Sequence, residues 1–296
     1  DIGDGDHTSL ACIPKITMGK AQLMVKEDGI LAGVELAQKI FHKVDSDLRI
    51  QILLKDGAKA RNGDVAFTID GNVLSILKAE RLVLNCMQRM SGIATITHEM
   101  VQLLKGTKTK ILDTRKTTPG FRMIEKWAVK IGGGENHRFG LFDMIIIKDN
   151  HVDYAGGIKC AIESTRSYLK QNHKDLKIEI EARNLEEVKE ILSVGGVNRI
   201  MLDNFSLENT REAVMLINGN DPSPDPFPKG RGEPARWNSP SPLKEVKGRG
   251  CIEIESSGGI TKKDIRAYAK CGVDYISVGA LTHSAGSLDL SLKAIK

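Results

Sequence analysis

"KIEIEARNLEEVKEILSVGGVNRIMLDN", residues 177–204, holds the pattern that decides the fold. Two short apolar stretches, at 177–181 and 199–203, indicate strands, and the amphipathic segment 184–194 between them indicates a helix. A strand, a helix and a second strand in this order predict one β/α unit whose two strands run parallel.

The same alternation continues from residue 110 almost to the C-terminus. Further strands are expected at 110–113, 143–148, 251–255 and 274–278. An amphipathic stretch at 262–271 lies between the last two of them. A series of six such strands favours a β/α barrel over an open sheet, although periodicity alone leaves a doubly wound sheet open.

The first hundred residues follow a different pattern. Residues 21–77 contain short strands that end at Asp-Gly turns, so we expect a small α+β domain there. Apolar residues then recur with helical spacing over 78–104, where Ser91-Gly92 marks either a break or a close helix contact. Arg89 lies off the apolar stripe of this helix, and the pattern alone favours a solvated surface charge.

A proline-rich segment at 219–249 interrupts the barrel pattern. Seven of the nine prolines lie between residues 222 and 242, which excludes a helix or a central strand. We expect an exposed insertion, with a proline-rich ligand for another domain as the alternative. Because it follows a helix at 206–217 and precedes a strand, it is expected on the barrel face opposite the active site.

The composition predicts a globular protein, since 41% of the 296 residues are apolar. The five cysteines are scattered without a CxxC pair, which argues against a disulfide framework or a zinc site. We therefore expect a reduced compartment, the cytoplasm or an organelle stroma. No signal-peptide pattern opens the chain and no apolar run suits a membrane span, so no membrane partner is expected. A net charge of +5 without a basic arm argues against a nucleic-acid partner.

Polar residues stand where the predicted strands end, which is where β/α barrels place catalytic groups. The ends differ in type along the chain. The early strands and the glycine-rich loop between them supply the cations Arg115, Lys116, Arg138 and Lys148 with His137. The middle strands supply the carboxylates Glu181 and Asp203. The last two strands supply Ser257, Gly258, Gly259, Gly279 and Ala280.

Each group of strand ends suits one kind of ligand. Arginine and lysine bind carboxylates or phosphates, and carboxylates on neighbouring strands suit Mg²⁺. Small residues that open a helix expose backbone N–H groups to phosphate. Taken singly, each residue could be an ordinary loop residue, and Glu181 could form a structural ion pair with Lys148. A Schiff-base aldolase acting through Lys116 or Lys148 also fits these residues.

Long motifs then point to a family. They are "GDHTS" (5–9), "ERLVLNCMQRMSGIAT" (80–95), "DTRKTTPGFRMIEKWAV" (113–129), "GGGENHRFGLFDMIIIKDNH" (132–151), "IEIEA" (178–182), "IMLDN" (200–204), "ESSGGI" (255–260) and "YISVGALTHS" (275–284). On these motifs, which cover nearly the whole chain outside 219–249, the sequence resembles quinolinate phosphoribosyltransferases. The resemblance implies an α/β protein: an N-terminal α+β sandwich domain with its connecting helix (1–104) and an incomplete β/α barrel (105–296).

The resemblance also implies roles for individual residues. Lys116, Glu181 and Asp203 are the expected catalytic residues. The expected quinolinate pocket consists of Arg115, Lys116, His137, Arg138 and Lys148, with Arg89 from a neighbouring subunit. Glu181 and Asp203 would face the ribose and hold Mg²⁺, directly or through pyrophosphate. The expected phosphate-binding residues are Ser257, Gly258, Gly259, Gly279, Ala280 and His283.

The implied reaction converts quinolinate and phosphoribosyl pyrophosphate to nicotinate mononucleotide, pyrophosphate and CO₂ in de novo NAD biosynthesis. Mg²⁺ is the one expected cofactor. The expected assembly is a homodimer with shared active sites, or a larger assembly of such dimers. Two other functions remain open at this point: a sister phosphoribosyltransferase that takes nicotinate, and a non-catalytic protein that binds phosphate or nucleic acid.

Overall fold

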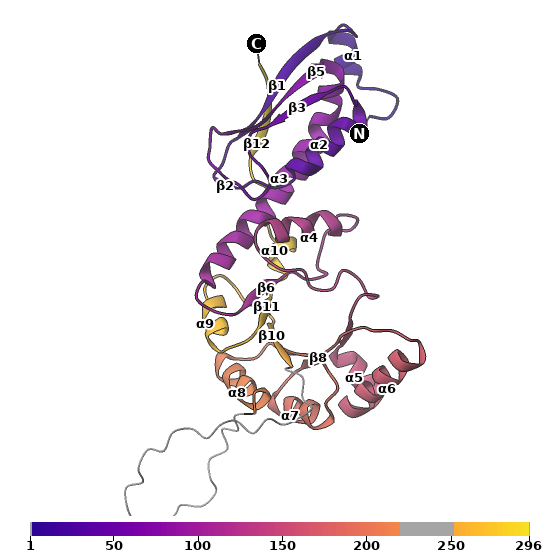
Figure 1. Cartoon of the computed structure of the whole chain (residues 1–296), viewed down its shortest axis with the longest axis vertical. Helices are drawn as coiled ribbons and strands as arrows, with labels where there is room; N and C mark the ends of the chain where they lie inside the picture. The colour runs from indigo at the N-terminus through magenta and orange to yellow at the C-terminus, as the bar shows by residue number, and fades with distance from the viewer. Residues whose placement is uncertain (1, 220–251, 296) are drawn as a thin grey trace, which may run out of the picture. The chain divides into compact units, whose positions relative to one another are not determined.

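The computed structural model describes residues 2–219 and 252–295 (Figure 1). The predicted insertion at 219–249 therefore lies outside the described residues, apart from Gly219. The chain forms two compact units. The first comprises Asp1–Leu141, Gly259–Arg266 and Ile276–Lys296, and the second comprises Phe142–Gly258 and Ala267–Tyr275.

An antiparallel sheet forms the N-terminal part of the first unit, in the order β12-β1-β5-β3. Its strands are β1 (Met18–Val25), β3 (Arg49–Ile52), β5 (Val65–Asn72) and β12 (Leu290–Ile295). Helix α2 (Val34–Val44) packs with them around a core that includes the fully buried Leu23, Phe41 and Phe67. Three shorter elements are α1 (His7–Cys12), β2 (Gly29–Ile30) and β4 (Lys59–Ala60). This is the α+β layer arrangement expected for the N-terminal domain.

Strand β12 comes from the opposite end of the chain. The predicted boundary at residue 105 groups it with the barrel, whereas its antiparallel pairing with β1 places it in the N-terminal sheet. Burial gives the physical reason, because Leu288 and Leu290 belong to the core beneath that sheet. A sequence boundary drawn at one position cannot represent a strand that returns to the other domain.

A long helix, α3 (Val73–Leu103), starts where β5 ends and confirms the helix predicted over 78–104. Its first turn is capped by Asn72, whose side chain accepts a hydrogen bond from the N–H of Ser75. The helix is continuous through Ser91 and Gly92. A Cβ atom at Gly92 would lie 1.9 Å from the carbonyl oxygen of Gly286, so this dipeptide marks a close contact and not a break.

The remaining strands form a six-stranded sheet in the order β6-β11-β10-β9-β8-β7. They are β6 (Lys110–Leu112), β7 (Ile145–Ile147), β8 (Ile178–Ala182), β9 (Arg199–Asp203), β10 (Glu253–Ser257) and β11 (Tyr275–Ser277). Helices separate successive strands: α4 (Arg122–Ile131), α5 (Asp149–Ala155), α6 (Ile158–Gln171), α7 (Leu185–Val194), α8 (Leu207–Ile217), α9 (Ile265–Lys270) and α10 (Ala280–His283). Strands β6 and β7 are the two edges, as expected for an incomplete β/α barrel. Among the described residues, no helix combines the length and apolar character needed to cross a membrane.

Within the second unit, the register sorts the side chains of β8, β9 and β10 onto two faces. Glu179, Arg199 and Glu253 are aligned across the three strands, and so are Glu181, Met201 and Glu255. The alternate positions are the buried residues Ile180, Ala182, Ile200, Leu202 and Ile254. Since side chains alternate along a strand, one face carries the charged residues together with Met201, and the other is mainly apolar. Helices α7 and α8 lie alongside these strands (Figure 1), and their residues Val188, Ile191 and Ala213 are buried.

Candidate active site

The loop after β6 carries the cations Arg115 and Lys116 in the first unit. Its backbone is fixed on both sides: the N–H of Lys116 donates to the hydroxyl of Thr114 at 3.0 Å, and the hydroxyl of Thr282 donates to the carbonyl of Lys116 at 2.8 Å. The two residues nonetheless remain exposed. The fold therefore presents two adjacent positive charges to solvent from a fixed backbone.

A buried network holds the glycine-rich loop beside it. Asp113 is fully buried, forms an ion pair with Lys126 and accepts hydrogen bonds from Asn136 and from the N–H of His137. Burial raises the pKa of Asp113, and the charge of Lys126 and these hydrogen bonds oppose that rise. The N–H of Arg138 donates to Nδ1 of His137 at 2.7 Å, so a neutral His137 carries its proton on Nε2. The network thus sets the backbone position and the tautomer of a predicted substrate-binding residue.

Arg89 is not the solvated surface charge that the helical pattern favours. Its guanidinium donates to the carboxylate of Glu125 at 2.8 and 3.0 Å and to the carbonyl of Ala285 at 2.7 Å. Glu125 is fully buried and also accepts hydrogen bonds from the N–H and hydroxyl of Thr118. The Arg89 side chain keeps 23% exposure. Its contribution to a neighbouring subunit stays a prediction.

Four predicted ligand-binding residues come together at α10, also within the first unit. A Cβ atom at Gly279 would lie 3.1 Å from Cδ of Lys116 and 3.2 Å from two ring atoms of His283. Ala280 begins the short helix α10, and Nδ1 of His283 lies 2.7 Å from the hydroxyl of Ser284. The structure therefore places Lys116, which is predicted to bind quinolinate, against the segment that is predicted to bind phosphate.

The second unit contributes Lys148 and the two predicted catalytic carboxylates. Lys148 pairs with Glu181, the contact given above as a structural alternative. The lysine side chain nevertheless keeps 45% exposure, so its ammonium group is accessible to a ligand. Ser257 stands opposite Asp203 in the register of β10 and β9, and Gly258 follows it. Gly259, the next residue of this predicted phosphate loop, is exposed and belongs to the first unit.

The carboxylates of Glu181 and Asp203 fit the predicted Mg²⁺. Glu181 is aligned with Met201, and Asp203 lies two residues further along β9, so both side chains project from the same face of the sheet. Mg²⁺ prefers oxygen ligands, and it commonly takes one or two carboxylates together with water and substrate phosphates. This donor set matches that preference.

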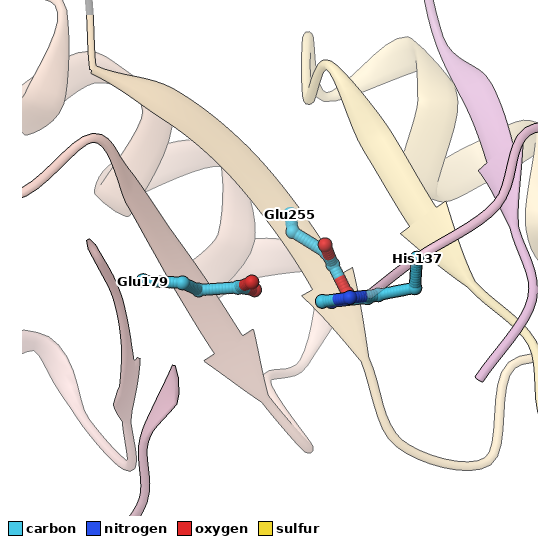
Figure 2. Close-up of side chains that lie close together, drawn as sticks. All are labelled: His137, Glu179 and Glu255. Carbon is cyan, nitrogen blue, oxygen red and sulfur yellow. The ribbon is translucent and has the colours of Figure 1, made fainter. Parts of the chain in front are cut away.

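The sequence motifs do not reveal a buried charge cluster on strands β8, β9 and β10. The guanidinium of Arg199 donates to Glu255 at 2.9 Å and to Glu253 at 3.0 Å, and it lies 3.9 Å from Glu179. Burial by itself lowers the pKa of Arg199, but Glu179, Glu255 and Glu253 together raise it more, so the pKa of Arg199 is raised. Figure 2 shows the side chains of Glu179 and Glu255 on their strands; His137, drawn with them, belongs to the first unit.

The signal for this cluster was present in the sequence. Strands 177–181 and 251–255 alternate glutamate with isoleucine, which is the period-two pattern of a strand with one polar face. Asp113, Glu125 and Asn204 were not assigned a role either. Of these, Asp113 and Asn204 directly follow a predicted strand core, whereas nothing local distinguishes Glu125 from a surface helix residue.

Comparison with known proteins identifies the family of the chain. The family model "Quinolinate phosphoribosyl transferase, N-terminal domain" matches residues 6–91. The model for the C-terminal domain of the same family matches residues 93–227 and 237–293. Together the two matches extend over both the N-terminal sheet and the parallel sheet.

Individual proteins resemble the chain over nearly its full length. Quinolinate phosphoribosyltransferase [decarboxylating] 2b, mitochondrial, of Nicotiana tabacum is 43% identical over 99% of this chain and 78% of that protein. A probable nicotinate-nucleotide pyrophosphorylase [carboxylating] of Bacillus subtilis is 38% identical over 99% of this chain and 89% of that protein. The crystal structure of NadC from Streptococcus pyogenes has a TM-score of 0.84 and 36% identity, and the match covers 100% of this chain and 93% of that one.

Proposed function

The chain belongs to the quinolinate phosphoribosyltransferase family, and we propose that the residues described above carry this family's reaction in the following way. The reaction is the transfer of a phosphoribosyl group from phosphoribosyl pyrophosphate to quinolinate with decarboxylation, a step of de novo NAD biosynthesis. The enzyme is a decarboxylating pentosyltransferase.

Quinolinate is held by its two carboxylates. Arg115, Lys116, Arg138 and Lys148 supply positive charge, and His137 supplies a ring N–H. The observation that carries this proposal is the fixed backbone of Arg115 and Lys116, tied by Thr114 and Thr282, with both side chains exposed. Adjacent cations repel each other, and a dianion between them removes that repulsion. Because the backbone is already ordered, little entropy is lost when the anion binds.

The transfer step forms one bond and breaks another. The pyridine nitrogen attacks C1′ while the bond from C1′ to pyrophosphate breaks, and the pyrophosphate takes the electron pair. The sugar is oxocarbenium-like in the transition state, and the carboxylates of Glu181 and Asp203 stabilise that positive charge. The same two carboxylates would hold Mg²⁺, directly or through pyrophosphate, and the bound ion would neutralise negative charge on the leaving group.

Decarboxylation follows from the positive charge on the ring. Once the nitrogen is ribosylated, loss of the 2-carboxylate as CO₂ leaves an electron pair on the carbon beside N⁺, which stabilises it. A proton from solvent then takes the place of the carboxylate. Meanwhile Ser257, Gly258, Gly259, Gly279 and Ala280, with His283, hold the 5′-phosphate.

The assembly and location are also proposals. The partially exposed Arg89 supports a homodimer in which this residue enters the partner's pocket, and larger assemblies of such dimers are compatible with it. We place the enzyme in the cytoplasm or an organelle; named plant relatives are mitochondrial or chloroplastic. No nucleic acid or membrane takes part in the proposed function.

An assay of CO₂ and pyrophosphate release from quinolinate and phosphoribosyl pyrophosphate tests the reaction. Lys116→Ala should lower kcat/KM by about 100-fold or more, since it removes a preorganised charge, while the melting temperature changes little. Lys43→Ala, at an exposed position of α2, is the matched control and should leave the rate unchanged.

Three results would contradict the proposal. One is release of neither product by the wild type. Another is faster turnover of nicotinate than of quinolinate, which would indicate the sister enzyme. The third is a borohydride-trapped adduct on Lys116 or Lys148, which would indicate a Schiff-base aldolase.

A further inference from the structure

Asn204 has an unusual backbone at the end of β9. Its φ is 56°, in the left-handed region, and among the described residues other than glycine only His173 also has a positive φ. Asparagine tolerates this region better than most residues do, though it is still uncommon there. The conformation is reached directly after Asp203, one of the two carboxylates assigned to phosphoribosyl transfer.

Both the side chain and the backbone of Asn204 are engaged. Its Nδ2 donates to Oδ2 of Asp203 at 2.9 Å, and its backbone N–H donates to the carbonyl of Ser257 at 2.9 Å. Ser257 is the residue aligned with Asp203 on the neighbouring strand. Asn204 therefore joins the end of β9 to the end of β10, although the residue is exposed.

The carboxamide of Asn204 also packs on the glycine that follows Ser257. A Cβ atom at Gly258 would lie 2.2 Å from Oδ1 and 2.6 Å from Cγ of Asn204. Glycine is needed at position 258 for this close approach and for its φ of 99°. The carboxamide is thus held between the Asp203 carboxylate and the backbone of the predicted phosphate loop.

We infer that Asn204 is a positioning residue for phosphoribosyl transfer, a role that rests on the proposed function. A free carboxylate rotates about its last bond. Because the amide of Asn204 holds Oδ2, Asp203 presents Oδ1 in one direction. The same amide sets the distance between that carboxylate and the Ser257-Gly258 backbone. The Asp203 carboxylate is expected at the ribose of phosphoribosyl pyrophosphate, and the Ser257-Gly258 backbone at its 5′-phosphate. By fixing the distance between these two groups, Asn204 fits both to the same substrate molecule.

Two substitutions distinguish the contribution of the Asn204 side-chain amide from that of its left-handed backbone. Asn204→Gly keeps the left-handed backbone, which glycine adopts freely, and removes the amide. Asn204→Asp keeps the shape, removes the donor and places a second carboxylate beside Asp203. His173→Gly is the matched control, because it makes the same backbone change at the other left-handed residue, in the segment between α6 and β8.

Loss of positioning should act on one substrate alone. We expect Asn204→Gly to lower kcat/KM for phosphoribosyl pyrophosphate by about 10-fold to 100-fold, as small misplacements of catalytic groups do. Its affinity for that substrate, measured by titration calorimetry, should weaken in parallel. The KM for quinolinate and the melting temperature should stay near the wild-type values. Asn204→Asp should lose more, and His173→Gly should lose nothing.

The role is wrong if Asn204→Gly keeps both the affinity and kcat/KM for phosphoribosyl pyrophosphate. It is also wrong if the constants for both substrates and the melting temperature fall together, since that marks a purely structural residue. If Asn204→Gly fails to fold, the same constants for the two substrates and the melting temperature are compared for Asn204→Asp, and that comparison tests the role. An inactive wild type would reject the proposed function, and the role of Asn204 in that function with it; a loss confined to the variants concerns Asn204 alone.

Discussion

At the residue scale, Gly92 shows how one contact overrides local preference. Glycine in the middle of a helix is about 1 kcal/mol less favourable than alanine. Gly92 nevertheless lies inside the 31-residue helix α3, because a Cβ atom there would meet the carbonyl oxygen and carbon of Gly286 at 1.9 and 2.8 Å. Its neighbour Ser91 is buried and exchanges hydrogen bonds with the backbone of Ala32. The helix surface here is shaped to accept two other segments of backbone.

Gly92→Ala should therefore destabilise the protein despite its better helix propensity. We expect the free energy of unfolding to fall by about 1–3 kcal/mol, the usual cost of overpacking, because the obstacle is backbone and cannot rotate away. Urea denaturation followed by circular dichroism measures the change. Gly286→Ala is the matched control: no atom lies within 4 Å of a Cβ there, and its stability should stay near wild type. A Gly92→Ala variant more stable than wild type would show that the two segments separate readily.

At the element scale, strands β8, β9 and β10 differ from those of ordinary barrels. Branched apolar side chains usually fill the interior of a β/α barrel. Here Glu179, Arg199 and Glu255 are buried on one face, while isoleucine and leucine occupy the other. Tyr275 adds its ring 4.1 Å from the Arg199 guanidinium. The charge of Arg199 thus helps to keep these carboxylates compatible with burial.

Arg199→Met should be strongly destabilising, and more so at high pH. Removing the positive charge of Arg199 from beside buried carboxylates costs about 3–5 kcal/mol. The raised pKa keeps Arg199 charged at both pH 5 and pH 8. Titration of Arg199 therefore adds no pH dependence to the stability of the wild type. In the variant, the folded state favours protonated carboxylates, so stability present at low pH is lost as pH rises. Denaturant unfolding at pH 5 and pH 8 should show the larger deficit at pH 8.

The control for this prediction is an arginine on the surface. Arg183 pairs with Glu187 and Asp153, but its side chain is 45% exposed. Exposed ion pairs contribute little to stability, so Arg183→Met should leave unfolding nearly unchanged at both pH values. Equal losses for the two variants, or a loss at Arg199 that does not depend on pH, would contradict the assigned role of the buried cluster.

At the scale of the whole molecule, Arg89 serves either the active site of its own chain or that of the partner subunit. Within its own chain it binds Glu125, which in turn holds Thr118 in the loop that carries Lys116. The proposed homodimer instead places Arg89 in the partner's pocket. These two assignments give opposite results when inactive subunits are mixed.

Arg89→Ala and Lys116→Ala should each be nearly inactive alone, and mixing them should restore about a quarter of wild-type activity. Random pairing makes about half the dimers mixed, and each mixed dimer has one intact site of two. Mass spectrometry confirms the exchange, and activity is measured before and after mixing. If exchange occurs and no activity returns, Arg89 serves its own chain. Arg89→Lys replaces Arg89→Ala if loss of the cation beside buried Glu125 prevents folding.

The parallel strands could be located from sequence because their signals are local. Each strand of the second unit alternates or runs apolar over a few residues, and the amphipathic helices between them need no distant information. The candidate site followed from the same signals. Strand ends in a β/α barrel meet at one edge, so Arg115, Lys116, Glu181 and Asp203 could be named from their positions alone.

What the sequence by itself determined, then, is the order of strands and helices and the residues at the strand ends. Only the tertiary structure decided which strands pair and which side chains contact each other across distant parts of the chain. Strand β12 pairs with β1, Arg89 binds a glutamate 36 residues away, and Asn204 packs on Gly258, which follows a different strand. The physical reason is range: periodicity and turn chemistry act between neighbours along the chain, whereas register, burial and close backbone approach depend on segments that meet only when the chain folds.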